Sequence, residues 1–191
     1  MSRKEKGPIL RRELLILENG VDFKNGYHGP HGSKSVDYEN FCFQSITDEL
    51  NLGSFAIGPH FIDELFNVNY LTVPGISIPD TIVFNTNDLD SWKIKELYEF
   101  KSGKGNGIDD KLDGFSKLLN QLRQHKNFLP FLLKEHLGEQ MPVPSEIIVP
   151  PDSKVKAVIV KPKLSGIETI SVNTKFPVEH RKITSSPSNS F

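Results

Sequence analysis

Apolar residues at positions 54–101 are spaced first as in a helix and then as in strands. Residues 54–66 carry large apolar side chains three and four positions apart, with Pro59 where a first helical turn accepts proline, and predict a helix. Two short apolar runs follow at 68–73 and 77–84, and the Pro-Gly pair between them favours a type II turn. We therefore expect a hairpin after the first helix.

The pattern changes again further along the chain. A polar connector at 85–92 leads to a third predicted strand at 93–101, in which the apolar alternation is imperfect. An Asp-Asp pair then precedes a helical stripe that is ended or interrupted by Pro130. The stripe consists of Leu112, Phe115, Leu118, Leu119 and Leu122. An apolar run at 157–160 predicts a strand covered on both faces.

The order helix, three strands, helix, strand predicts an α/β fold in which a small mixed sheet is flanked by helices. A chain of 191 residues with 37% apolar composition is long enough for one such domain and too short for two of ordinary size. We assign residues 1–53 to an N-terminal extension of helix and loop, 54–175 to the core and 176–191 to a disordered tail. Residues 168–172 predict one more strand.

Charge is unevenly distributed, although the net charge of −1 excludes a broadly basic protein that binds nucleic acid by bulk electrostatics alone. Residues 37–64 contain six acids and no Lys or Arg, whereas residues 151–191 contain seven bases and three acids. The asymmetry suits an acidic pocket for cations beside a surface for phosphate, and scattered charge on solvated faces explains it equally well.

The single cysteine, Cys42, excludes an intrachain disulfide, a zinc finger and a cysteine-ligated iron–sulfur cluster. Its aromatic neighbours predict a buried small hydrophobic residue. The N-terminus has no apolar run long enough for a signal peptide, and no segment approaches membrane-spanning length. We expect an intracellular, cytoplasmic protein without a membrane partner.

Candidate chemistry lies in Pro79-Asp80 and Glu99-Phe100-Lys101. Frequency does not distinguish these motifs, because the chain contains four acid-x-Lys tripeptides where about two are expected by chance, and a second Pro-Asp pair ends at Asp152. Their position in the predicted fold distinguishes them, because only Asp80 and Glu99 lie on predicted neighbouring strands. In a strand, Glu99 and Lys101 emerge on one face and Phe100 on the other.

Two carboxylates that converge from adjacent strands form an oxygen site for Mg²⁺ or Mn²⁺, and a nearby ammonium can orient or help to deprotonate a water. Burying both carboxylates without a cation would be costly. The natural substrate of this arrangement is a phosphodiester.

These motifs resemble those of the PD-(D/E)xK nucleases, the restriction-endonuclease-like superfamily, whose αβββαβ core has the predicted order of elements. The resemblance covers about residues 54–162. It implies that Asp80 and Glu99 bind the metal with the carbonyl of Phe100, and that Lys101 positions the attacking water. Lys104, in the following Gly-rich loop, would neutralise a neighbouring phosphate or be an ordinary exposed lysine.

The segment also resembles the RecB-type branch of that superfamily. Gly58, His60 and Glu64 are similar to its Gly-His-acid motif, with fewer residues between the Gly and the His; they imply His60, and Glu64 beside it, as additional ligands that favour Mn²⁺. Gln121 and His125 are similar to its Gln-x-x-x-Tyr motif near substrate phosphates, with His in place of Tyr. A plain surface face of the helix explains these two residues equally well.

The resemblance implies a metal-dependent deoxyribonuclease that binds nucleic acid. An RNA endonuclease with the same metal chemistry and a non-catalytic nucleic-acid-binding protein of the same fold are the alternatives. The sequence does not discriminate DNA from RNA, endonuclease from exonuclease action, or one oligomeric state from another.

Overall fold

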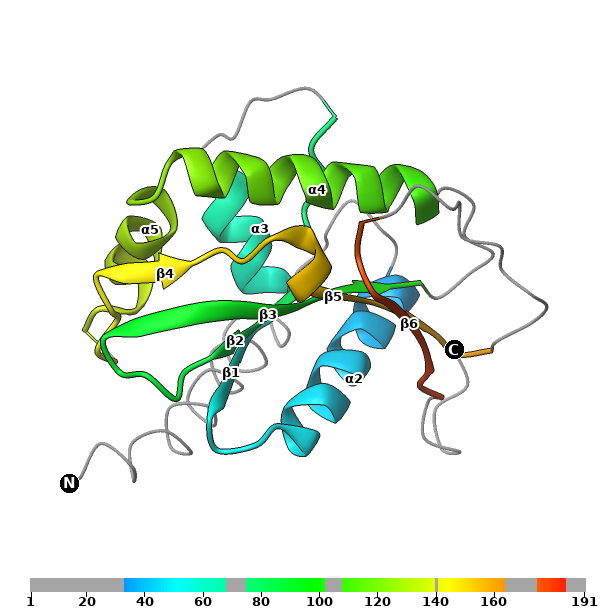
Figure 1. Cartoon of the computed structure of the whole chain (residues 1–191). Helices are drawn as coiled ribbons and strands as arrows, with labels where there is room; N and C mark the ends of the chain where they lie inside the picture. The colour runs from blue at the N-terminus through cyan, green and yellow to red at the C-terminus, as the bar shows by residue number, and fades with distance from the viewer. Residues whose placement is uncertain (1–32, 68–74, 102–107, 140, 164–174, 185–191) are drawn as a thin grey trace.

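The computed structural model describes residues 33–67, 75–101, 108–139, 141–163 and 175–184 (Figure 1). The elements in chain order are α2 (Ser33–Glu49), β1 (Ser54–Ile57), α3 (Pro59–Asn67), β2 (Thr81–Asn85), β3 (Ser91–Phe100), α4 (Ile108–Gln124), α5 (Phe128–Leu137), β4 (Glu146–Ile148), the 3₁₀ turn η1 (Asp152–Lys154), β5 (Lys156–Lys161) and β6 (Val178–Lys182).

The described strands form one six-stranded mixed sheet in the order β1-β2-β3-β5-β6, with β4 paired to the first residues of β3. β1, β2 and β3 are antiparallel neighbours, whereas β5 runs parallel to β3 and β6 parallel to β5. Helix α2 covers one face of the sheet, and α3, α4 and α5 lie over the other (Figure 1). The predicted α/β class and the mixed sheet flanked by helices are confirmed.

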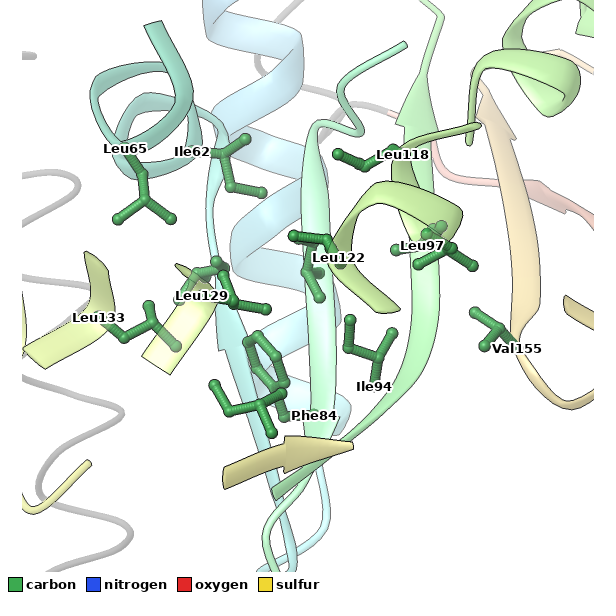
Figure 2. Packing of buried hydrophobic residues seen from close by; sticks show 14 of the residues in the cluster. Ile62, Leu65, Phe84, Ile94, Leu97, Leu118, Leu122, Leu129, Leu133 and Val155 are labelled. Carbon is green, nitrogen blue, oxygen red and sulfur yellow. The ribbon is translucent and has the colours of Figure 1, made fainter. Parts of the chain in front are cut away.

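The larger core lies between the sheet and helices α3, α4 and α5, where leucines from the helices pack on strand side chains (Figure 2). The predicted helical stripe supplies the centre of this core. Its members are all buried: Leu112, Phe115, Leu118, Leu119 and Leu122. Apolar positions three and four apart therefore fix both the helix and the face that it buries.

The smaller core lies under α2. Tyr38, Cys42, Phe43 and Ile46 pack there against the other face of the sheet. Cys42 is fully buried, as its aromatic neighbours predict. The predicted boundary between the N-terminal extension and the core, after residue 53, therefore separates α2 from the sheet on which it packs.

The imperfect alternation at 93–101 has a structural cause. The register between β2 and β3 shifts after Val83, and Lys95 is an additional residue in β3. Such a bulge reverses the alternation beyond it. Ile94 and Leu97, three positions apart, consequently pack in the same core.

The strands predicted at 93–101 and 157–160 are confirmed, but the helix predicted at 54–66 is wrong in its first part. Residues 54–57 form β1, whose four residues are all buried, and the helix begins only at Pro59. A short apolar run that is buried on both sides has no period by which to distinguish strand from helix. β1 is a partner of β2, while the strand expected at 68–73 lies outside the described residues.

Two further expectations are corrected near the C-terminus. Pro130 does not lie at the end of the long helix: α4 ends at Gln124, and Pro130 lies in the first turn of α5, where its missing N–H has no intrahelical partner to lose. Part of the expected disordered tail at 176–191 forms β6, which pairs with β5. The strand expected at 168–172 lies outside the described residues.

No helix in the described part of the chain combines the length and the apolar character needed to cross a membrane.

We predict that Phe43→Ala lowers the free energy of unfolding by about 3–5 kcal/mol, because the ring is 2% exposed between α2 and the sheet. Phe131→Ala on α5 is the matched control: its residue is 57% exposed, and we expect a change of about 0.5 kcal/mol or less. Urea unfolding measures both variants. A loss in Phe43→Ala no larger than that of the control would mean that α2 is not part of the cooperative unit.

Candidate active site

One end of the sheet gathers the two predicted motifs. Thr81, the first residue of β2, is paired with Tyr98 near the end of β3. The end of β1 lies beside the start of β2, because Ile57 is paired with Ile82. The end of β5 lies beside the end of β3. The residues that precede β2 and those that end β3 therefore meet at this end.

Asp80 is tied to β3 by two hydrogen bonds. Its backbone N–H donates to the carbonyl oxygen of Tyr98 at 2.8 Å, and its Oδ2 accepts the backbone N–H of Phe100 at 2.7 Å. The second bond ends at the peptide group between Glu99 and Phe100, so it holds the Asp80 carboxyl beside Glu99. The structure brings the two acids together, although Asp80 lies directly before β2 and not on the strand predicted at 77–84.

Glu99 is buried, with 4% of its surface exposed, and faces α4. Its Oε1 forms ion pairs with Nζ of Lys101 at 3.1 Å and with Nζ of Lys111 at 3.4 Å. Its Oε2 is buried and has no hydrogen-bond partner in the described part of the protein. Phe100 packs on the opposite face in the α2 core, as the strand period predicts.

The Asp80 carboxyl resists ionisation. Burial is the main cause that raises the pKa of Asp80 well above its usual range, and the negative charges of Glu99 and Glu39 raise this pKa further. The hydrogen bond from Phe100 and the positive charge of Lys111 lower it without offsetting the effect of burial. Asp80 therefore holds a proton more tightly than an exposed aspartate does.

Sequence reasoning missed two residues of this site. Lys111 reaches Glu99 from the first turn of α4, and the charge of Glu39 on α2 acts on Asp80. Weak signals for both exist: Lys111 ends one of the four acid-x-Lys tripeptides, and Glu39 belongs to the acid-rich segment. Neither signal identifies a partner, because tertiary packing sets the distance from a helix to a strand.

Three predicted residues lie where their contacts are not described. Helix α3 begins directly after β1, so the backbone of His60 lies at the same end of the sheet as Asp80. The side chains of His60 and Glu64, and all of Lys104, lie outside the described part of the structure. Their assignment as metal ligands and as a phosphate contact stays a prediction.

Gln121 and His125 lie toward the other end of α4. Gln121 is half-buried, and exposed His125 follows the helix, with its N–H bonded to the carbonyl oxygen of Gln121 at 2.9 Å. At about 1.5 Å per residue, Gln121 lies about 15 Å further along the axis than Lys111. A phosphate bound there would be remote from Asp80 and Glu99.

A cavity of about 810 Å³ lies on the flank of α4, away from the two carboxylates. Its lining consists of Ser116, Lys117, Asn120, Arg123, Pro151, Asp152, Ser153 and Lys175. Arg123 donates to Oδ1 of Asp152 at 2.6 Å, and the Ser116 hydroxyl donates to Oδ2. Both oxygens of Asp152 are thus paired and hold a connection against α4, whereas Oε2 of Glu99 has no partner among the described residues. We therefore place the candidate active site at Asp80 and Glu99.

The described residues contain no group of three or more His, Cys, Asp or Glu side chains arranged to hold a metal ion. Two carboxylates suffice for Mg²⁺, which proteins usually hold through one or two carboxylates while it keeps several waters. Asp80 and Glu99 fit such an ion, because Oε2 of Glu99 is a buried acceptor for which the described residues supply no donor. In a strand, the N–H and the carbonyl group of one residue point toward the same neighbour. Because the Phe100 N–H is bonded to Asp80, the Phe100 carbonyl also points toward Asp80.

Among the described residues, the site thus consists of three acids, Asp80, Glu99 and Glu39, and two lysines, Lys101 and Lys111, at one end of a mixed sheet. Comparisons of the chain with protein-family models, curated proteins and solved structures found no match. The function is therefore inferred from Asp80, Glu99, Lys101 and Lys111.

We predict that Asp80→Asn stabilises the protein at neutral pH in the presence of a chelator. The amide oxygen still accepts the Phe100 N–H, and a carboxyl that is costly to ionise is removed. Because the pKa of Asp80 is raised on folding, the folded wild type binds the proton more tightly than the unfolded chain. Wild-type stability therefore falls as pH rises from the unfolded pKa of about 3.9 through the folded value.

Urea unfolding at a series of pH values measures this difference. The advantage of Asp80→Asn should grow as pH rises above about 4 and vanish below it. A difference that does not vary with pH would contradict the raised pKa of the half-buried Asp80 carboxyl.

Proposed function

We propose that the chain is a metal-dependent nuclease of the PD-(D/E)xK type that hydrolyses phosphodiester bonds in DNA. The observation that carries the proposal is the buried Oε2 of Glu99, which has no hydrogen-bond partner in the described residues and belongs to an acid whose charge acts on Asp80. Buried polar atoms are rarely left unpaired, and an ion is one of the few explanations for an exception.

The side chains have distinct roles in this proposal. Asp80 and Glu99, with the carbonyl of Phe100, would hold Mg²⁺ or Mn²⁺, which supplies Lewis-acid activation of the phosphate and of the attacking water. Lys101 orients the water and stabilises the charge that develops on the scissile phosphate. The N–H of Lys101 donates to the carbonyl oxygen of Val160 at 2.9 Å, so the pairing of β3 with β5 anchors this lysine.

The element order supports the restriction-endonuclease-like core as the finer description of the fold. α2, β1, β2, β3, α4 and β5 follow the order helix, three antiparallel strands, helix and parallel strand, with α3 inserted after β1. In this proposal the first helix of the core is α2, not the helix at 54–66 expected from the sequence. Asp80 then precedes the second strand of the core, and Glu99 lies at the end of the third.

Cleavage assays test the proposed activity with linear and circular, single- and double-stranded DNA and with RNA, in Mg²⁺, Mn²⁺ or chelator. We expect metal-dependent cleavage of DNA that falls about a hundredfold or more in Asp80→Asn and in Lys101→Gln, the typical loss for one catalytic group. Lys117→Gln is the matched control, because this half-exposed lysine pairs with Asp113 at 3.0 Å on α4. It should keep the wild-type rate.

The other outcomes separate the alternatives. Cleavage of RNA alone would assign the same chemistry to an RNA endonuclease. Metal-independent binding of nucleic acid without cleavage would support a non-catalytic protein. Equal cleavage by wild type and both variants would reject the assigned site.

Calorimetric titration tests the metal ligands separately from activity. We expect Glu99→Gln to bind Mn²⁺ at least about tenfold more weakly than wild type, because it loses a charged ligand. His60→Ala should weaken Mn²⁺ binding more than Mg²⁺ binding, because imidazole is a better ligand for Mn²⁺. Unchanged Mn²⁺ affinity in His60→Ala would remove His60 from the site.

A further inference from the structure

Glu99 is approached by two ammonium groups. Lys101 and Lys111 place Nζ 3.1 Å and 3.4 Å from the same oxygen, Oε1. One lysine suffices to balance the charge of Glu99, and two like charges this close repel each other. The second lysine therefore calls for another explanation.

Lys111 also acts on the second carboxyl of the site. Its positive charge lowers the pKa of Asp80, against the larger effect of burial. The ammonium thus contacts Glu99 directly and acts on Asp80 through its charge. Lys111 thus supplies positive charge to the same pair of groups that would hold a metal ion.

The fold holds the two lysines differently. Lys101 directly follows β3, and its backbone N–H donates to the carbonyl oxygen of Val160, so its backbone is fixed two residues from Glu99. Lys111 reaches across from α4, and 35% of its side chain is exposed, against 24% for Lys101. A long, partly solvated lysine stem can turn its ammonium outward with little loss of packing.

We propose that Lys111 is a placeholder cation: in the metal-free protein its ammonium neutralises the Asp80–Glu99 pair, and it yields this place when a divalent ion binds. The released ammonium turns to the solvent side of the site and binds the incoming substrate phosphate. Metal binding and phosphate binding are thereby coupled through one side chain. The inference rests on the proposed metal-dependent function, and it makes Lys111 an anion-binding residue that only the bound metal makes available.

Mn²⁺ calorimetry on the full chain, without nucleic acid, compares wild type with Lys111→Gln and Lys101→Gln. Both substitutions remove one positive charge near the same oxygen, so Lys101→Gln controls for general electrostatics. We expect Lys111→Gln to bind Mn²⁺ about tenfold more tightly than wild type and Lys101→Gln to gain about threefold or less, because only Lys111 is displaced. Equal gains in the two variants would overturn the placeholder role.

Lysine acetylation of the wild-type chain, followed by mass spectrometry, detects the displacement directly. Adding Mn²⁺ should increase the reactivity of Lys111 several-fold and leave that of Lys117 unchanged. Unchanged or reduced reactivity of Lys111 would overturn the proposal.

The results also distinguish this inference from the proposed function. If wild type and both variants bind no Mn²⁺, the metal-dependent function and the placeholder role both fall. If wild type and Lys111→Gln bind Mn²⁺ with the same affinity, only the placeholder role falls.

Discussion

The hydrogen bond from the Phe100 N–H to Oδ2 of Asp80, at 2.7 Å, joins the start of β2 to the end of β3. The last backbone bond between the two segments runs from the Asp80 N–H to the carbonyl oxygen of Tyr98. The Asp80 side chain adds one more bond beyond it. The geometry of the candidate site depends on it, because it holds one carboxyl beside the peptide of Glu99. A slip of one residue in this register would turn Glu99 to the α2 face and separate the two acids.

Bringing two carboxyls together near the core carries an electrostatic cost. The raised pKa of Asp80 reflects that cost, and so does Oε2 of Glu99, which has no partner in the described part of the chain. Lys101 and Lys111 offset part of it through Oε1 of Glu99. Strain of this kind is typical of binding and catalytic sites, where an arrangement suited to a ligand is less stable without it.

The helices on the two faces of the sheet place charged side chains near the Asp80–Glu99 pair from opposite sides. The buried stripe of α4 sets the rotation of the helix and so directs Lys111 toward Glu99. On the other face, the core under α2 holds that helix close enough for Glu39 to act on Asp80. The apolar packing of α4 and α2 on the sheet therefore positions Lys111 and Glu39 near the two acids.

The sequence by itself determined the features that depend on local periodicity: the stripe of α4, the strands β3 and β5, and the shared face of Glu99 and Lys101. Tertiary structure decided that residues 54–57 form a strand, that part of the expected tail adds β6 to the sheet, and that Lys111 and Glu39 join the site. The physical reason is the distance along the chain over which each kind of interaction acts. A local pattern reports which face of a segment is buried, whereas pairing partners and the charge around a carboxyl depend on residues far apart in the chain.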